Sequence, residues 1–272
     1  EKPFFLYFPL PAPHTPILPT TEFMGKSNTN MYGDFVLQVD DLVGKIVAEL
    51  ERQGIVDNTL LIFTSDNGCS PKANFSELAK VGHDPSNGFR GHKADIYEGG
   101  HRVPFIVQWP DKISGGKITD QIICTTDFMA TVADILDEKM PENAGEDSFS
   151  FLKVLNGSMD SEVRPSIIHH SIEGRFAIRK DNWKLVAWSG SGGWTAPRSA
   201  KELAGLPAMQ LFDLSKDPGE QINLINDYPQ VALNLKKEMI SLIKEGRSTP
   251  GPPLVNDGPE IWEQVKWAYE AE

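Results

Sequence analysis

Apolar residues recur with a helical period along one stretch near the start of the chain. Between residues 32 and 53 they lie three or four positions apart, at Val36, Val39, Val43, Ile46, Val47 and Leu50. This spacing gathers them on one face of an α-helix, and Gly54 follows at a position where helix ends favour glycine. The pattern predicts an amphipathic helix over 32–53.

Three short runs are almost continuously apolar: PFFLYF at 3–8, TLLIFT at 59–64 and VPFIVQW at 103–109. Such runs are typical of strands that are covered on both faces. The order strand, helix, strand over the first 64 residues indicates a parallel α/β sheet. A further helix is expected over 126–136.

The pattern changes after about residue 145. Short strand candidates separated by turn residues occur at 166–169, 175–179, 183–188 and 210–214. A helical period follows over 228–244, so this region predicts a small antiparallel sheet with one helix. We therefore expect two parts, an α/β core over 1–150 and a C-terminal subdomain over 151–272.

The charge of the chain disfavours two classes of partner. The 272 residues carry a formal net charge of −12, which repels phosphate backbones and anionic lipid headgroups. No run reaches the ~18 apolar residues that a membrane-spanning helix needs. We expect neither nucleic acid nor membrane as a partner.

Asp66 and Asn67 follow the predicted strand at 59–64, at the strand end where open α/β sheets place their ligands. Carboxylate and amide oxygens suit calcium or magnesium, although Asp-Asn-Gly is also typical of a plain turn. His14 follows the strand at 3–8. If the two strands are parallel neighbours, His14 and Asp66 converge; otherwise His14 is incidental.

A second cluster is basic. Five basic or imidazole side chains lie within thirteen residues, at Arg90, His92, Lys93, His101 and Arg102. In a strongly acidic chain this density indicates an anion pocket, although each residue alone also suits a solvated loop. The candidates for contact with an anionic substrate are His14, His83, Arg90, Lys93 and His101.

Several strings resemble the motifs of type I sulfatases of the alkaline-phosphatase superfamily. They are FTSDNG, FRGHKADIYEGGHRVPFIVQWP, LFDLSKDPGEQINL and PAPHTP, and the helix that contains Asp40, Asp41 and Gly44 matches in order and spacing. The resemblance covers nearly the whole chain, and motifs of this length are specific. It implies an alkaline-phosphatase-like α/β fold, with a mixed, mostly parallel sheet flanked by helices.

The resemblance also implies a sulfuric ester hydrolase and a role for four residues. Asp66 and Asn67 correspond to ligands of Ca²⁺, with Mg²⁺ as the alternative. Lys93 corresponds to the lysine that binds the sulfate and its bridging oxygen, and His14 to the histidine that assists the leaving group. These roles suit the chemistry, because negative charge develops on the leaving oxygen.

In this family the nucleophile is a formylglycine made within a Cys-or-Ser-x-Pro-x-Arg sequence, which this chain lacks. Cys69-Ser70-Pro71 imitates its first half, but Ala73 stands at the arginine position and the segment follows the metal motif. We therefore expect the formylglycine in an N-terminal region outside this chain, and the chain alone to be inactive. Two cysteines, Cys69 and Cys124, are too few for a disulfide framework.

Without that region the chain should expose an apolar face, and we expect it to associate with the missing half or with itself. Because the family is usually exported, a periplasmic or extracellular location is expected. The substrate would be a sulfated small molecule or glycan, and basic and aromatic loop residues such as His83, His101 and Trp194 suit a sulfated polysaccharide.

Two other functions compete with this one. A phosphatase or phosphodiesterase of the same superfamily would use similar strand ends, although the lysine in RGHKADIYEGG favours a sulfatase. A non-catalytic fragment could instead bind anions or glycans through the same basic residues, without turnover.

Overall fold

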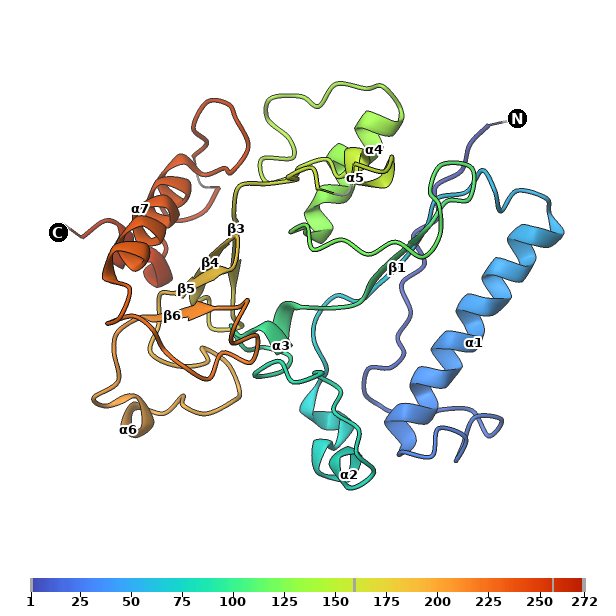
Figure 1. Cartoon of the computed structure of the whole chain (residues 1–272), viewed down its shortest axis with the longest axis horizontal. Coiled ribbons are helices and arrows are strands. Elements are labelled where there is room, and N and C mark those ends of the chain that lie inside the picture. The colour runs from blue at the N-terminus through green and yellow to red at the C-terminus, as the bar shows by residue number, and fades with distance from the viewer. Residues whose placement is uncertain (1, 159, 256, 271–272) are drawn as a thin grey trace. The chain divides into compact units, whose positions relative to one another are not determined.

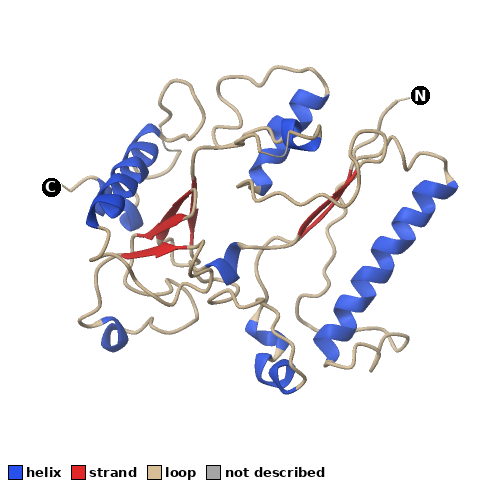
Figure 2. Cartoon of the chain, viewed as in Figure 1, coloured by secondary structure: helices blue, strands red, loops and turns tan. Residues whose placement is uncertain are grey.

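The computed structural model describes residues 2–158, 160–255 and 257–270. Figure 2 shows helices and short strands joined by long loops. The longer helices are α1 (Met31–Arg52), α2 (Phe75–Lys80), α4 (Phe128–Ile135) and α7 (Pro229–Glu245), and the one-turn helices are α3 (Glu98–His101), α5 (Leu152–Leu155) and α6 (Ala200–Leu203). The strands are β1 (Leu61–Thr64), β2 (Phe105–Gln108), β3 (Ile167–His170), β4 (Phe176–Lys180), β5 (Trp183–Val186) and β6 (Gln210–Asp213). The 3₁₀ helices are η1 (Pro71–Ala73), η2 (Thr125–Asp127) and η3 (Glu263–Ala268).

The chain forms two compact units. The first comprises Glu1–Thr59 and Cys69–Asn87, and the second comprises Leu60–Gly68 and Gly88–Glu272. The division predicted at residue 150 is based on a change in the hydrophobic pattern, whereas these two units are defined by their compactness. That division stays a prediction.

The long helix α1 of the first unit confirms the helix predicted over 32–53. Its N-terminus is capped by the side chain of Asn30, which accepts hydrogen bonds from the backbone N–H groups of Tyr32 and Gly33 at 3.0 and 3.2 Å. After the last turn Gly54 adopts a left-handed conformation with φ of +66°. Both ends therefore use the capping residues that helices prefer.

The predicted buried strand at 3–8 is wrong. These residues form no strand, and Phe5 and Tyr7 are 82% and 78% exposed. A buried strand needs neighbours for its backbone groups and for both faces, and none of the described residues supplies them. The apolar composition of the segment showed that it favours a covered position, but not what covers it.

The strands β1 and β2 confirm that the runs at 59–64 and 103–109 form strands, but not a parallel sheet. Nor are these strands covered on both faces as predicted, because every residue of β1 is only half-buried and Ile106 of β2 is 61% exposed. They pair antiparallel, with Leu61 opposite Gln108 and Thr64 opposite Phe105. Both sheets among the described residues are antiparallel. The parallel arrangement was inferred from the strand at 3–8, and it is absent here because that strand does not form.

The predicted C-terminal sheet and its helix are confirmed. The strands pair antiparallel in the order β3-β4-β5-β6, and α7 lies against them (Figure 1). Successive residues of a strand face opposite sides of the sheet. The face toward α7 is buried, because its residues Ile178, Leu185 and Leu211 pack in one cluster with Ala232, Leu235 and Met239 of the helix.

The opposite face of this sheet is covered by the basic loop that the sequence singled out. Ile96 and Tyr97, both fully buried, pack against Ala177, Val186 and Phe212. The loop over 89–102 is therefore anchored to the C-terminal sheet by apolar contacts. This anchoring decides the geometry of the candidate site.

The helix predicted over 126–136 is confirmed as η2 followed by α4. Its start is held by the buried Asp127, whose carboxylate accepts hydrogen bonds from the backbone N–H groups of Cys124 and Phe149 and pairs with Arg164. In the part of the chain that the structure describes, no helix combines the length and apolar character needed to cross a membrane.

Candidate functional site

Asp66 and Asn67 form a turn directly after β1. Asp66 is exposed and Asn67 is half-buried. The side-chain amide nitrogen of Asn67 donates to the Gly68 carbonyl at 3.0 Å, and the Ser65 hydroxyl donates to the Asn67 carbonyl at 3.1 Å. These bonds fix the turn and leave the carboxylate of Asp66 and the amide oxygen of Asn67 as candidate ligands.

These two oxygens fit part of a hard-cation site. Calcium takes about six to eight oxygen ligands, and carboxylates and amide carbonyls are among its preferred donors. Across the described residues no group of three His, Cys, Asp or Glu side chains is placed to hold a metal ion. The chain therefore offers some ligands of such a site but not a complete set.

Gly68 joins this turn to the basic loop. Its backbone N–H donates to the Gly100 carbonyl at 3.0 Å. A Cβ atom at Gly68 would lie 1.8 Å from the Gly99 carbonyl oxygen, so no larger residue fits without moving backbone. The Asp66-Asn67 turn and the helix α3 are thus held together by backbone contact within the second unit.

Lys93 lies on the basic loop, five positions before α3. Its side chain is half-buried, and no described residue forms a hydrogen bond or ion pair with its ammonium group. Cations that are partly buried usually have an anionic partner. Lys93 is therefore available to bind an anion that is not part of this chain.

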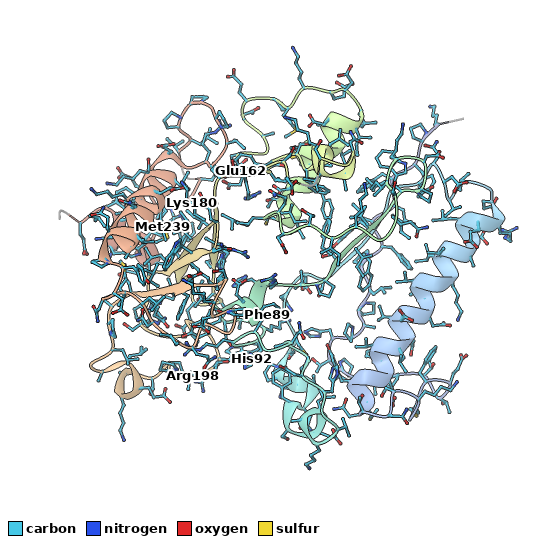
Figure 3. The ribbon with its side chains drawn as sticks, in the orientation of Figure 1. Phe89, His92, Glu162, Lys180, Arg198 and Met239 are labelled. Atoms are coloured by element: carbon cyan, nitrogen blue, oxygen red, sulfur yellow. The ribbon has the colours of Figure 1, made fainter. Side chains whose placement is uncertain are left out.

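Asp95 shapes the loop around Lys93. Its buried carboxylate accepts hydrogen bonds from the backbone N–H groups of His92, Trp194 and Thr195, at 2.9, 2.7 and 3.0 Å. The imidazole of His92, which Figure 3 labels, lies 3.1 Å from the Thr195 hydroxyl through its Nε2 atom. Sequence reasoning missed Asp95 and Thr195, since nothing local shows that a segment a hundred residues away returns to this loop.

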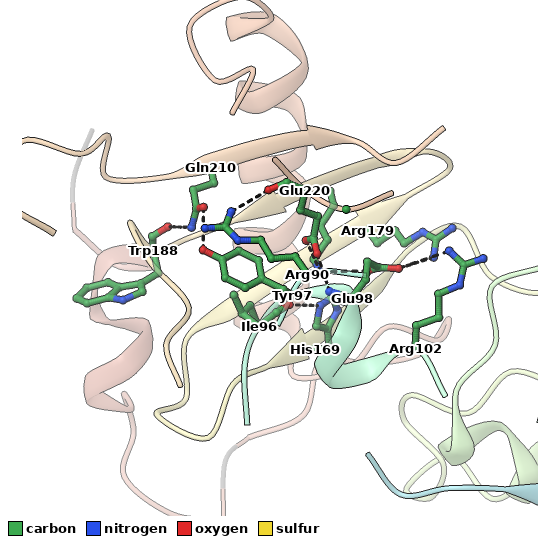
Figure 4. A network of polar contacts seen from close by, with 12 residues as sticks. Arg90, Ile96, Tyr97, Glu98, Arg102, His169, Arg179, Trp188, Gln210 and Glu220 are labelled. Carbon is green, nitrogen blue, oxygen red and sulfur yellow. Dashed lines mark hydrogen bonds and ion pairs between the residues drawn. The ribbon is translucent and has the colours of Figure 1, made fainter. Parts of the chain in front are cut away.

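The helix α3 after Lys93 is fixed by a buried ion cluster (Figure 4). The ammonium group of Lys184 lies 3.1 Å from Glu98 and 2.8 Å from Glu220. Glu220 also accepts a hydrogen bond from the backbone N–H of Glu98 at 2.6 Å. Two strings that resemble family motifs, one around Glu98 and one around Glu220, therefore meet on one lysine.

The two carboxylates of this cluster titrate differently. Burial alone would raise the pKa of Glu98, but the positive charges of Lys184 and Arg179 outweigh it and hold that pKa below its usual value. For Glu220 burial dominates over the attraction of Lys184, and its pKa is raised. Glu98 is consequently the firmly ionised partner of the lysine.

Arg90, a predicted substrate contact, has partners inside the protein. Its guanidinium group lies 3.9 Å from the centre of the Tyr97 ring and donates to the Glu220 carbonyl at 2.8 Å (Figure 4). The Tyr97 hydroxyl in turn donates to Gln210 at 3.2 Å. Arg90 thus helps to attach the loop to the C-terminal sheet, and its contact with a substrate stays a prediction.

His101, a second predicted contact, is turned toward the interior. Its ring lies 4.4 Å from the ring of His169, and its buried Nε2 atom has no hydrogen-bond partner among the described residues. Burial, and then the charge of Lys184, lower the pKa of His101 to about 4. His101 is therefore neutral at neutral pH and supplies no positive charge to an anion pocket.

His14 and His83 belong to the first unit, whereas Asp66 and Lys93 belong to the second. His14 is exposed on its loop, with its Nδ1 atom 2.8 Å from the Thr15 carbonyl oxygen. His83 is exposed after α2. The convergence of His14 with Asp66 stays a prediction, as does the place of His83 in the anion pocket.

Cys69 lacks the environment of a nucleophile. Burial raises the pKa of its thiol, which keeps the thiolate fraction low at neutral pH, whereas reactive cysteines have a lowered pKa. Cys69 and Cys124 are both free thiols. The raised pKa agrees with the expectation that Cys69 is not the nucleophile.

Residues 1–138 match the family described as sulfatase, and residues 91–245 match the family described as N-sulphoglucosamine sulphohydrolase, C-terminal. The chain belongs to the sulfatase family. These matches confirm the resemblance to type I sulfatases that the FTSDNG and RGHKADIYEGG strings indicated.

Relatives of the chain carry sulfatase names. An N-acetylgalactosamine-6-O-sulfatase of Bacteroides thetaiotaomicron is 36% identical, over 90% of this chain and 48% of that protein. An N-acetylgalactosamine-6-sulfatase of Mus musculus is 30% identical, over 94% of this chain and 51% of that protein. The chain spans about half the length of these curated relatives.

A solved structure from a study of glycosaminoglycan metabolism by B. thetaiotaomicron has the same fold. It superposes with a TM-score of 0.78 at 36% identity, and the match covers 89% of this chain and 50% of that one. The predicted α/β fold class of the alkaline-phosphatase-like superfamily is thereby confirmed.

Proposed function

We propose that the intact protein is a sulfuric ester hydrolase, and that this chain supplies its sulfate-binding lysine and part of its metal site. The observation that carries the proposal is the position of Lys93. It is a half-buried cation without a partner among the described residues, on a loop joined to the Asp66-Asn67 turn through Gly68 and Gly100. A sulfate group could accept a charge-assisted hydrogen bond from this ammonium group.

Each residue has a defined task in this proposal. Lys93 binds the sulfate and stabilises the negative charge that develops on the bridging oxygen as the ester bond breaks. His14 donates a proton to the leaving oxygen. Asp66 and Asn67 hold Ca²⁺, with Mg²⁺ as the alternative, which when bound polarises the sulfate oxygens. The formylglycine belongs to a region outside this chain.

The names of the relatives support a substrate class. Two of them are named for the sulfate at position 6 of N-acetylgalactosamine. We propose a sulfated amino sugar within a glycan as the substrate, and a periplasmic or extracellular location, where such glycans occur. Cell fractionation with an antibody against the chain tests the location, and recovery in the cytoplasm would contradict it.

Sulfate release from N-acetylgalactosamine 6-sulfate tests the activity. We expect release by an extended protein that includes the upstream region, none by this chain alone, and loss on Lys93→Ala or Asp66→Ala. Lys112→Ala and Asp111→Ala, which change exposed residues of the same unit, serve as matched controls. Sulfate release by the chain alone would refute the half-site proposal, and faster hydrolysis of the corresponding phosphate ester would favour a phosphatase.

A further inference from the structure

One exposed aromatic side chain lies on the segment that Asp95 holds against the Lys93 loop. Trp194 is 40% exposed, whereas the backbone on both sides of it is fixed. The carboxylate of Asp95 accepts hydrogen bonds from the backbone N–H groups of both Trp194 and Thr195. The indole is thus displayed from a rigid backbone instead of a loose loop tip.

The glycines before Trp194 make this contact close. A Cβ atom at Gly193 would lie 2.5 Å from the Ala94 carbonyl oxygen, and one at Gly192 would lie 2.5 Å from the Ser171 hydroxyl. The backbone N–H of Ile96 also donates to the Ser191 carbonyl at 2.9 Å. The segment over 191–195 therefore packs along the backbone of 94–96, directly after Lys93.

The ring of Trp194 is partly exposed and lies near the imidazole of His92. Its centre lies 6.4 Å from that of the His92 imidazole, and the two planes are tilted by 47°. The Nε2 atom of His92 lies 3.1 Å from the Thr195 hydroxyl, which adds a link between the two segments. A large, partly exposed aromatic face on a segment that is joined to the loop of an unpaired cation suits a binding surface.

We propose that Trp194 is a stacking platform for the sugar ring whose sulfate binds Lys93. A sulfated pyranose combines an anionic group with a ring face of C–H groups, so it needs a cation and an apolar surface side by side. Lys93 provides a cation and Trp194 an aromatic face, on two segments that Asp95 joins. This inference rests on the proposed function, and it assigns recognition of the sugar ring to Trp194 and recognition of the sulfate to Lys93.

The test distinguishes recognition of the sugar ring from recognition of the anionic group. The ligands are N-acetylgalactosamine 6-sulfonate, in which a C–S bond prevents hydrolysis, and the open-chain alcohol obtained from it by reduction. Affinities of both for the full-length protein are measured by calorimetry. In Trp194→Ala we expect about tenfold weaker binding of the cyclic ligand and unchanged binding of the open-chain ligand.

Three further variants control for indirect effects. Trp194→Phe retains an aromatic face and should keep most of the affinity for the cyclic ligand. Trp262→Ala removes another exposed tryptophan, 50% accessible, and should leave both affinities unchanged. Lys93→Ala should weaken both ligands equally, since both carry the anion.

Three binding results would overturn the inference. Equal loss for both ligands in Trp194→Ala would mean that the side chain only supports the Lys93 loop, and no loss, or no binding by the unchanged protein, would exclude the platform. Sulfate release is measured separately with the cyclic 6-sulfate. Ring-selective binding through Trp194 without sulfate release would support the platform and refute the proposed hydrolase.

Discussion

Lys184 and Glu98 form an ion pair of 3.1 Å in which the side chains are 0% and 5% exposed. Glu98 lies in the helix that follows the Lys93 loop, and Lys184 lies in a central strand of the C-terminal sheet. Because charges removed from water need a close partner, this pair ties the position of α3 to that of the sheet. The geometry of the candidate site thus depends on residues that do not contact it.

Replacing the buried lysine should be severely destabilising. Lys184→Met leaves the carboxylates of Glu98 and Glu220 buried without their shared cation, and we expect a loss of about 3–5 kcal/mol in the free energy of unfolding. Lys216→Met removes a lysine that is 78% exposed and should change stability little. Urea denaturation followed by circular dichroism measures both variants, and similar stability of the two would contradict the role given to Lys184.

A pair of glycine variants tests the contact between the two loops. Gly68→Ala forces a methyl group against the Gly99 carbonyl oxygen, so we expect a loss of about 1–3 kcal/mol. Gly44→Ala lies on α1, where a Cβ atom would have nothing within 4 Å, and should stabilise by about 0.5–1 kcal/mol. Thermal unfolding of both variants checks the opposite signs, and a stabilised Gly68→Ala would show that the contact is not close.

Stability should fall in mildly acidic solution because of buried histidines. The unfolded chain binds a proton on His101 near the ordinary pKa, whereas the folded protein binds it only near pH 4. As the pH falls from about 6.5 toward 4, the unfolded state is favoured by up to about 1.4 kcal/mol per pH unit for each such histidine. His169, whose pKa burial also lowers, acts in the same direction.

Replacing His101 tests this dependence of stability on pH. In His101→Gln we expect a weaker dependence of the unfolding free energy on pH in this window, measured by urea titrations across it. His83→Gln changes an exposed histidine and should leave the slope as it is. An unchanged slope in His101→Gln would show that the imidazole is not held neutral.

The exposed segment over 3–8 should cause self-association of the chain. Phe5 and Tyr7 are 82% and 78% exposed, and apolar side chains gathered in this way favour burial against another surface. We expect the double change Phe5→Ser and Tyr7→Ser to reduce association, measured by sedimentation velocity over a range of concentrations. Ile118→Ser removes a single apolar residue that is 92% exposed elsewhere, and an equal effect would rule out a specific role of the segment.

The sequence predicted those features that depend on residues close together along the chain. The helix α1 follows from the spacing of its apolar residues and from Gly54, and the C-terminal strands follow from short apolar runs between turns. The segment at 3–8 was misjudged because a pattern shows that a strand prefers burial, not whether a neighbour is present. For the same reason the antiparallel pairing of β1 with β2 could not be read from strand order.

The candidate site shows the same limit. Lys93, Asp66 and Asn67 were found because each belongs to a recognisable string, and the structure joins their segments. Lys184 was missed because one lysine in a strand carries no local sign of a buried charge. The inward orientation of His101 depends on His169, which lies on a distant strand, so a basic cluster in sequence proved to be only partly a basic surface.

The contact of Gly68 with Gly99 and Gly100 is made by main-chain atoms, so it does not depend on which side chains flank it. Loop residues outside the Lys184 ion cluster and the Asp66-Asn67 turn can therefore be exchanged during divergence without altering the spacing between the two loops. A lineage could acquire a preference for a different ester through substitutions at such loop positions alone. The glycines themselves would then persist across enzymes that no longer share a substrate.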